Sequence, residues 1–406
     1  MTPKAGSSLA LLHLPPRSSS RQAPAALTYD FTTPIERRGT GCIKYDRRPE
    51  LDPFWVADMD FASAPEILEA MHRRVDHGVF GYAQAHEGLV ESVLEYLQRR
   101  HSYTADHSQL IHLGGMVPAL SLAGRAFAKP GDSIITCTPV YPPFLGVHED
   151  NGLQLKQVPH SRDQSGRWSF DWEALEGTVD ASCRFFILCH PQNPLGRVFS
   201  PAEVEKLAEF CQRHDLILIS DEIHCDLVLD EDTDPFVSAL QLPGKFHDRL
   251  MVLQSPSKTW NIAGLGYAYA VVPDASLRRR YAAARGHTLP EINTISYYAA
   301  EAAYRHGEPW RIELLDTLRN NRATLDSFLR ERVPALRYQP AAATYLAWID
   351  GSGLGVPNPA LHFEENAGLF LSDGAYFAAP DHFRLNFGCP QSRLLEGLEK
   401  IAAATV

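Results

Sequence analysis

Densely apolar runs alternate with helix-like segments along the middle of the chain. Five short runs are apolar at nearly every position: Ser133–Thr138, Arg184–Cys189, Leu216–Ser220, Leu250–Gln254 and Tyr267–Val272. Such runs are typical of strands that are buried on both faces of a mostly parallel sheet. Their alternation with helices predicts an α/β domain in which right-handed crossovers connect the strands.

Two helices are predicted from their N-terminal residues, one at Ser63–His77 and one at Ser200–His214. Each segment begins with a serine that is followed three residues later by a glutamate, which is the spacing of a capping box. A proline lies in the first turn of each, and apolar residues recur at helical spacing behind it. A third helix is expected within Pro309–Arg332, and strand-like segments follow at Thr344–Asp350 and His382–Asn386.

The 406 residues are enough for more than one compact unit. We expect a large domain at residues 75–295 and a smaller α+β domain formed by both chain ends, residues 27–74 and 296–406. Residues 1–26 are rich in Ser, Pro and Ala and contain no acidic residue. This composition predicts a disordered tail, with a cleaved organelle transit peptide as the alternative.

Composition excludes several classes of protein. The net charge is −11, from 38 basic and 49 acidic residues, and no basic cluster is present. Nucleic-acid binding is therefore not expected. No apolar run approaches 18 residues, so we expect no transmembrane helix. Seven dispersed cysteines without a CxxC pair favour reduced thiols and a cytoplasmic protein rather than a zinc or redox motif.

Chemically useful side chains follow four of the predicted strands. Tyr141 follows the first strand, Asn193 the second, Asp221 the third and Lys258 the fourth. Ligands of open α/β sheets bind beyond the carboxyl ends of the strands. We therefore expect an aromatic ring, an amide, a carboxylate and an amine around one crevice.

This set of groups suits pyridoxal 5′-phosphate. The amine of Lys258 can form a Schiff base with the aldehyde of the cofactor. A carboxylate such as Asp221, facing the ring nitrogen, keeps that nitrogen protonated because an adjacent opposite charge favours the charged form. Tyr141 can stack on the ring, and Asn193 can donate to the ring oxygen.

The phosphate of such a cofactor needs backbone amides and hydroxyl groups. Residues 114–117, Gly-Gly-Met-Val, open a predicted helix that continues to Ala126 and would supply amides at its N-terminus. Ser255 and Ser257 would supply hydroxyls.

Two other kinds of chemistry are weaker alternatives. Asp221, Glu222 and His224 could ligate a metal, but no HExxH or similarly spaced set accompanies them, so no metal site is predicted. Residues 255–258 also match the S-x-x-K pattern of penicillin-recognising enzymes. Those enzymes need a KTG partner motif, which this chain lacks.

The motifs resemble those of fold-type I pyridoxal-phosphate enzymes of the aminotransferase class I/II superfamily. More narrowly, they resemble the MalY/PatB-type cystathionine β-lyases, also called C–S lyases. The stretches that carry the resemblance, which covers residues 28–402, are Trp55–Phe61, Gly78–Tyr82, Ser220–Leu227, Ser257–Leu265 and Arg384–Pro390.

The resemblance implies a role for each candidate residue. Contacts to the cofactor are implied for Lys258, Asp221, Asn193, Tyr141, His224, Met116, Val117, Ser255, Ser257 and Tyr82. Lys258 is implied to be both the Schiff-base lysine and the proton carrier, and His224 to lie near the ring oxygen.

Substrate contacts and assembly are also implied by the resemblance. Arg384 would bind the α-carboxylate of the substrate through its guanidinium fork, beside Asn193. Tyr82 would reach the phosphate region of a neighbouring subunit and act there, so a homodimer with shared catalytic sites is implied.

The chain departs from the family pattern at three places. Many aminotransferases carry an arginine eight residues after the lysine, where this chain has Gly266, as the lyase-like subgroup does. The NPTGR motif has Leu195 in place of threonine. The stretch Asp350–Gly353 lacks the Cys-Arg that often follows the aspartate in the lyases. The last departure leaves the details of substrate choice open.

The activity implied is β-elimination from a small thioether amino acid, cystathionine or a cysteine S-conjugate, to give pyruvate, ammonia and a thiol. An aminotransferase would share every cofactor residue and is the alternative. A pyridoxal-phosphate-binding regulator without turnover is a third hypothesis, although no DNA-binding extension is visible in the sequence.

Overall fold

The computed structural model describes residues 28–405, except 165, 287–288 and 290. Its largest sheet has seven strands in the order β2-β10-β9-β8-β7-β3-β4. Only β10 runs antiparallel to its neighbours, β2 and β9. The strands are β2 (Leu110–Leu113), β3 (Ser133–Thr138), β4 (Gln154–Pro159), β7 (Cys183–Cys189), β8 (Ile217–Asp221), β9 (Leu250–Gln254) and β10 (Ala268–Val271).

The five apolar runs predicted as strands are confirmed, with ends that differ by one residue at most. Almost every residue of the central strands β3, β7, β8 and β9 is buried, because helices cover both faces of the sheet. Consecutive residues of a strand face opposite sides of the sheet: Ile134 and Phe185 belong to one core cluster, and Ile135 and Phe186 to the other. The edge strand β4 is mostly polar and partly exposed, so its pattern did not mark it as a strand.

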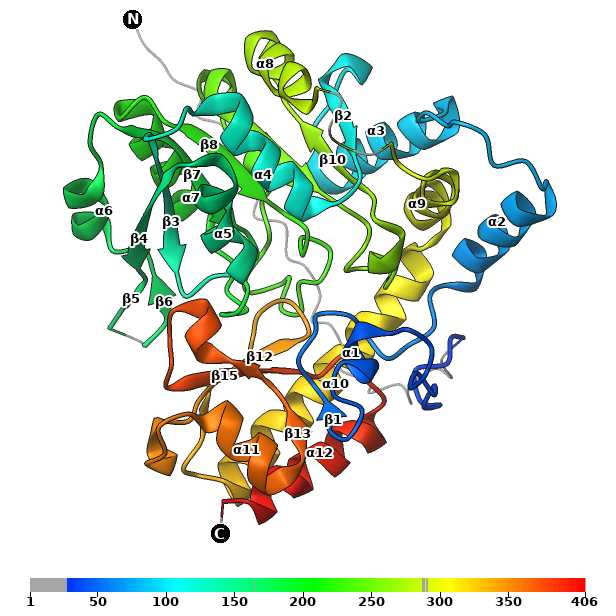
Figure 1. The fold of residues 1–406 in the computed structure, drawn as a ribbon, viewed down its shortest axis with the longest axis vertical. Coiled ribbons are helices and arrows are strands. Elements are labelled where there is room, and N and C mark those ends of the chain that lie inside the picture. The colour runs from blue at the N-terminus through cyan, green and yellow to red at the C-terminus, as the bar shows by residue number, and fades with distance from the viewer. Residues whose placement is uncertain (1–27, 165, 287–288, 290, 406) are drawn as a thin grey trace, which may run out of the picture.

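Helices form a layer on each face of this sheet (Figure 1). One core cluster joins the sheet to α4 (Met116–Phe127), α5 (Pro142–Asn151) and α8 (Ala275–Arg285). The opposite cluster joins it to α3 (Glu87–His101), α6 (Trp172–Thr178), α7 (Pro201–Arg213) and α9 (Thr294–His306). Against α9 packs α2 (Pro65–Asp76). This three-layer arrangement confirms the predicted α/β class.

A second, antiparallel sheet brings the two ends of the chain together. Its order is β11-β12-β15-β14. A two-stranded sheet beside it pairs β1 with β13, so residues near position 52 lie next to residues near 369. The strands are β1 (Asp52–Pro53), β11 (Arg337–Tyr338), β12 (Leu346–Asp350), β13 (Leu369–Phe370), β14 (Ser372–Asp373) and β15 (His382–Asn386).

Three longer helices pack around this second sheet (Figure 1). They are α10 (Glu308–Arg332), α11 (Pro359–Ala367) and α12 (Gln391–Ala403). The short helix α1 (Ile43–Asp46) precedes β1, and the β5–β6 hairpin (Ser161–Arg162 and Trp168–Ser169) projects from the large sheet. The domain boundaries at residues 74 and 295 stay a prediction, and the expected tail, residues 1–26, lies outside the described residues.

The two predicted capping boxes have different outcomes. In α7, Ser200 accepts from the backbone N–H of Glu203 and Glu203 accepts from that of Ser200, as predicted. The capping box expected for α2 is wrong. The hydroxyl of Ser63 donates to the carbonyl of Asn261, and Glu66 accepts from the hydroxyl of Tyr29. Tertiary partners have therefore replaced the local ones, and α2 begins at Pro65 without a side-chain cap.

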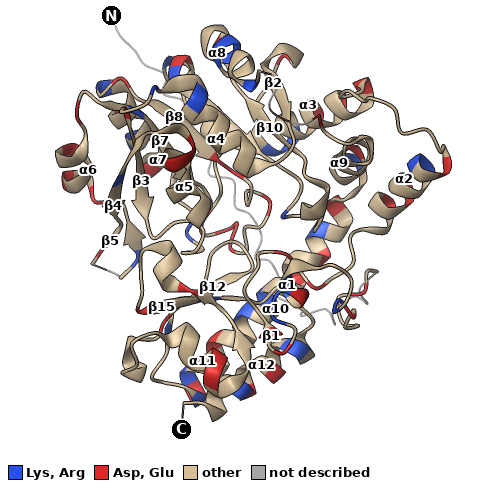
Figure 2. Cartoon of the chain, viewed as in Figure 1, with Lys and Arg blue, Asp and Glu red and all other residues tan. Residues whose placement is uncertain are grey.

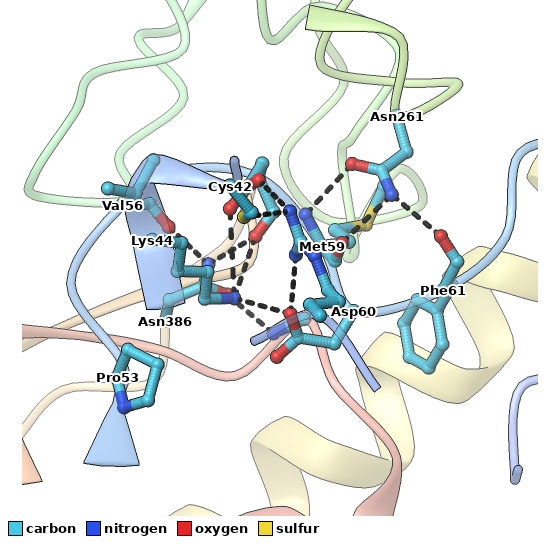
Figure 3. Close-up of polar contacts among 12 residues, drawn as sticks. Cys42, Lys44, Pro53, Val56, Met59, Asp60, Phe61, Asn261 and Asn386 are labelled. Atoms are coloured by element: carbon cyan, nitrogen blue, oxygen red, sulfur yellow. Dashed lines mark hydrogen bonds and ion pairs between the residues drawn. The ribbon is translucent and has the colours of Figure 1, made fainter. Parts of the chain in front are cut away.

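A buried ionic cluster holds the N-terminal segment against the rest of the chain (Figure 3). Asp60 lies 3.0 Å from the amine of Lys44 and 2.6 Å from the guanidinium of Arg37. Arg37 also pairs with Asp58 at 2.5 Å. Lys44 is 1% exposed and Asp60 is 3% exposed, so these charges stabilise one another out of water.

Charges elsewhere lie mainly on helices and loops, with both signs interspersed (Figure 2). No helix in the described ranges combines the length and apolar character needed to cross a bilayer. Within the same ranges no three His, Cys, Asp or Glu side chains are grouped so that they could hold a metal ion. All seven cysteines are free thiols.

The ionic cluster predicts a large stability cost for Asp60→Asn. The substitution keeps the shape of the side chain but leaves Lys44 and Arg37 with one buried anion fewer, which costs about 3 kcal/mol. Chemical denaturation should show this loss as a lower midpoint. Asp316→Asn breaks an exposed pair with Arg319 and is expected to change stability by less than about 0.5 kcal/mol. Equal effects of the two substitutions would contradict the prediction.

Candidate active site

A cavity of about 190 Å³ lies at the carboxyl ends of β3, β7, β8 and β9. These strands run parallel, so the residues that follow them meet at the same edge of the sheet. Eight of the predicted site residues line the cavity: Met116, Val117, Tyr141, Asn193, Asp221, His224, Ser257 and Lys258. The expected crevice is therefore present.

Lys258 follows β9 and its side chain is enclosed by the cavity walls. Its amine donates to the carbonyl oxygen of Ala57 at 2.7 Å. Burial lowers the pKa of Lys258 to about 8, and the nearby charge of Asp58 opposes this change. A lysine of this kind is partly neutral near physiological pH, so its amine can act as a nucleophile or a base.

Asp221 ends β8 and is 2% exposed. Its carboxylate accepts from the backbone N–H of Ile223 at 3.1 Å, and burial raises its pKa to about 7. No ion pair involves Asp221 in the described part of the chain. A cationic partner in the cavity would therefore favour its charged form.

His224 lies on the turn after β8 with its ring buried. Among the described residues its Nδ1 has no hydrogen-bond partner. Burial, together with the charges of Lys258 and Arg384, lowers the pKa of His224 well below its usual range. The ring is therefore neutral and can offer one donor or one acceptor to a ligand.

Arg384 lies in β15, on the second sheet, and reaches across to the first. Its guanidinium donates to Asn193 Oδ1 at 2.9 Å, to the carbonyl of Trp55 at 2.8 Å and to Ser372 Oγ at 3.2 Å. All three acceptors are neutral, and no carboxylate of the described residues pairs with it. A buried cation without an anion is costly, so the site is suited to bind an anionic ligand.

The N-terminus of α4 borders the cavity on another side. Gly115, at φ 143°, precedes the first turn, which begins with Met116 and Val117. Free backbone amides at a helix N-terminus favour a phosphate. Ser257 lines the same cavity.

Ser255 is not brought to the cavity surface. Its hydroxyl donates to the carbonyl of Tyr267 at 2.5 Å and accepts from the backbone N–H of Ser257 at 3.1 Å. The only proton of the Ser255 hydroxyl is therefore already used. The contact between Ser255 and the cofactor phosphate stays a prediction.

The structure explains why residue 266 is a glycine. Gly266 has a φ of +62°, and a Cβ atom there would lie 3.1 Å from the carbonyl oxygen of Gly114. A side chain would therefore meet both backbone strain and the loop that leads into α4. An arginine could occupy this position only if that loop moved.

Sequence reasoning missed several residues of the site. The carbonyl of Ala57 accepts hydrogen bonds from both Lys258 and Tyr345, and Tyr267 lines the cavity. Ala57 lies in the Trp55–Phe61 motif, but no pattern shows that a carbonyl oxygen far away in sequence meets the lysine.

Tyr82 does not reach the cavity of its own chain. It lies between α2 and α3, and its side chain is fully exposed. Its action on a neighbouring subunit stays a prediction.

A second hollow, of about 410 Å³ between α2 and α9, is larger than the cavity but is lined mainly by arginines and histidines of the helix faces. Lys258 and Asp221, whose pKa values are shifted by burial, both line the smaller cavity.

The residues present fit pyridoxal 5′-phosphate. The cavity contains a partly buried amine, a buried carboxylate and a histidine nitrogen, and the last two have no ion-pair or hydrogen-bond partner, respectively, among the described residues. The amides of a helix N-terminus and the hydroxyl of Ser257 lie beside them. Each group matches one need of the cofactor: its aldehyde, its ring nitrogen, its ring oxygen and its phosphate.

Comparisons with known proteins agree with this site. Residues 54–401 match the family model described as aminotransferase class I and II. The chain is 36% identical to "Cystathionine beta-lyase PatB" of Bacillus subtilis (strain 168), and the match covers 92% of this chain and 99% of that protein.

Two solved structures are similar over almost the whole chain. The structure described as OvoB has a TM-score of 0.89 and 38% identity over 93% of this chain and 99% of its own. Cystalysin from Treponema denticola, crystallised with pyridoxal 5′-phosphate, has a TM-score of 0.88 and 30% identity over 93% of this chain and 99% of its own. These likenesses confirm the expected fold type I, and the cystalysin structure contains the cofactor that the sequence predicts. The chain belongs to the aminotransferase class I and II family and, within it, resembles the MalY/PatB-type lyases.

Proposed function

We propose that the chain is a pyridoxal 5′-phosphate-dependent carbon–sulfur β-lyase that cleaves cystathionine or cysteine S-conjugates to pyruvate, ammonia and a thiol. The observation that carries the proposal is the arrangement of Lys258, which is partly buried, with Asp221 and Arg384, which are buried; none of the three has an ion-pair partner among the described residues. The names of the relatives at high coverage support elimination over amino transfer.

The residues that hold the cofactor follow from its chemistry. Lys258 would be the attachment point, Asp221 would pair with the ring nitrogen, and Tyr141 would stack on the ring. Asn193 and His224 would serve the ring oxygen. Met116, Val117 and Ser257 would hold the phosphate, and Ser255 would support them through the hydrogen bond that it accepts from the backbone N–H of Ser257. When bound, pyridoxal phosphate supplies an electron sink for the negative charge that develops at the substrate Cα.

Arg384 orients the substrate. Its fork binds the α-carboxylate in the geometry that guanidinium and carboxylate share, and Asn193 supports it through the 2.9 Å contact to Nη1. Fixing the carboxylate fixes the direction of the Cα–H bond relative to Lys258.

Lys258 moves the proton. Because burial lowers its pKa to about 8, the neutral amine is accessible near pH 8 and accepts the proton from Cα. The Cα–H and Cβ–S bonds break, and the sulfur leaves as a thiolate that takes up a proton. Water hydrolyses the eliminated enamine to pyruvate and ammonia, which completes the atom balance.

We also infer a cytoplasmic homodimer in which Tyr82 serves the site of the neighbouring subunit. Tyr82 is fully exposed, as are large parts of Val79 and Phe80 beside it, although apolar and aromatic residues usually bury such area. Seven free thiols agree with a reducing compartment.

The role of Lys258 is tested by Lys258→Ala. We expect borohydride to trap the cofactor covalently on the parent protein and not on the variant, and pyruvate formation from cystathionine to fall by at least about 10³-fold. Mass spectrometry and a pyruvate assay without added keto acid measure the two effects. Lys245→Ala, at an exposed lysine, is the matched control and should behave as the parent.

The same assay separates the lyase from an aminotransferase. Elimination yields pyruvate from the thioether alone, whereas amino transfer requires an acceptor keto acid. A parent enzyme that converts cystathionine only when an acceptor is added would contradict the proposal.

The burial of Asp221 predicts a pH-dependent difference in stability. Because its folded pKa is raised to about 7, the cofactor-free protein loses stability as pH rises through that value, while Asp221→Asn does not. Between pH 5 and pH 8 the free energy of unfolding of the variant should improve relative to the parent by about 2.5 kcal/mol, at 1.36 kcal/mol per pH unit. Urea denaturation at the two pH values measures it, and a constant difference would be the contrary result.

The role of Tyr82 is tested by complementation. We expect Tyr82→Phe and Lys258→Ala each to lower activity at least tenfold. In a refolded equimolar mixture, roughly one quarter of the parent activity should return, because half of random dimers are mixed and each has one intact site. No recovery, with dimers confirmed by light scattering, would show that Tyr82 does not act across subunits.

A further inference from the structure

A third hollow, of about 310 Å³, lies outside the cofactor cavity, between the β5–β6 hairpin and the second sheet. Its lining combines two tryptophans, three ionisable groups of opposite signs and one histidine. These residues are Trp168, Trp348, Arg162, Arg337, Asp350 and His382.

The hollow lies on the same sheet face as Arg384. Trp348 and Arg384 are direct partners across β12 and β15, and so are Asp350 and His382. Partners across strands share one face, as do residues two positions apart in a strand. His382 therefore lies one row of side chains away from Arg384, about 7 Å along β15.

Aromatic contacts connect the two places. The guanidinium of Arg384 lies 4.8 Å from the ring centre of Phe377, whose ring meets that of Trp348 at 5.3 Å. Trp348 stacks on His382 at 5.1 Å. Packed aromatic side chains therefore form a continuous row from Arg384 to the edge of the hollow.

Two buried polar atoms beside the hollow have no hydrogen-bond partner among the described residues. Trp348 is 6% exposed, yet its Nε1 makes no hydrogen bond with any described residue, and the same holds for Nε2 of His382. Buried polar groups usually have partners, and an unsatisfied one destabilises a fold. An acceptor oxygen of a ligand would satisfy Trp348 Nε1, and His382 Nε2 can accept or donate according to its tautomer.

The charged side chains around the hollow include both cations and an anion. Arg162 lies 4.0 Å over the ring of Trp168, and Arg337 lies 3.8 Å from Asp350. The two arginines offer cations for a carboxylate, and Asp350 offers an anion for an ammonium group. The hollow is therefore complementary to the two charges of an amino acid.

Two of the three family departures border this hollow. Leu195, which replaces the usual threonine, lines it and packs with Trp348 and Phe377. Asp350 lines it and directly precedes Gly351 and Ser352, where the lyases often have Cys-Arg. The chain thus differs from the family pattern where the hollow is formed.

We propose that this hollow is a leaving-group subsite, which selects thioethers whose sulfur carries a second amino-acid end. This inference rests on the proposed function, because the scissile end must be bound by Arg384. The carboxylate of the leaving group meets Trp348 Nε1 and the arginines, and its ammonium group meets Asp350. Trp348 and Arg337 are specificity-determining residues, separate from the groups that move the proton.

The test compares two substrates with the same scissile bond. Cystathionine carries a second amino-acid end, and S-ethylcysteine does not. Trp348→Phe keeps an aromatic ring but removes the donor, and Arg337→Gln removes an exposed charge that does not support the core. We expect kcat/KM for cystathionine to fall at least tenfold in the first variant and about threefold in the second, mainly through KM.

The short substrate and a remote arginine are the controls. Activity on S-ethylcysteine should stay within about twofold in both variants, and Arg332→Gln, at an exposed arginine of α10, should change neither substrate. Equal losses on both substrates would show that the residues act on the fold, and an unchanged value for cystathionine would show that the hollow does not bind its second end. Either result overturns the proposal.

A binding measurement keeps the subsite separate from the elimination reaction. In the Lys258→Ala background, loaded with pyridoxal phosphate, cystathionine binds without turnover, and calorimetry gives its Kd. Addition of Trp348→Phe should raise that Kd at least tenfold, and an unchanged Kd overturns the subsite. A parent enzyme that makes no pyruvate from either thioether would instead contradict the lyase function, which the calorimetry does not test.

Discussion

The segment from Trp55 to Phe61 is the constraint on which the site depends, because the second sheet and the loop that carries Lys258 both bind it. Asn386, from the second sheet, donates to the carbonyls of Val56 and Asp58 at 2.6 Å each. Asn261, three residues after Lys258, donates to the carbonyls of Met59 and Phe61 (Figure 3). The carbonyl of Ala57 is thereby fixed where it accepts from Lys258. The position of the amine thus depends on a stretch of backbone 200 residues away in sequence.

The ionic cluster around Asp60 and the neighbouring site differ in whether their buried charges are paired. Around Asp60, each buried charge has an opposite charge nearby, and the cluster holds the N-terminal segment in place. At the site, Asp221 in the cavity wall and Arg384 beside Asn193 are buried with neutral hydrogen-bond partners only. The first arrangement contributes to stability and the second lowers it. A region that keeps unneutralised charges needs rigid surroundings, and the ionic cluster next to it provides them.

Much of this structure follows from the sequence, because its main signals are local. The strands β3, β9 and β15 were predicted with the observed bounds, since nearly all of their residues are buried. Tyr141, Asn193, Asp221 and Lys258 were expected to meet because parallel strands end at one edge, and they do. The unpredicted features are long-range contacts. Ser63 and Ser255 use their hydroxyls on distant carbonyls, and no spacing in the sequence encodes those partners.

The register of one strand connects reaction and selectivity. Arg384 and His382 are two residues apart in β15, and their partners Trp348 and Asp350 are fixed by the same ladder. Any shift of the second sheet against the first therefore moves the groups for the α-carboxylate and those for the leaving group together. A substrate that occupies both places contacts this sheet at two points about 7 Å apart. The bound substrate is then less free to rotate than one held at Arg384 alone. Binding of the remote end then improves the alignment of the Cα–H bond with Lys258, although no atom of that end takes part in the reaction.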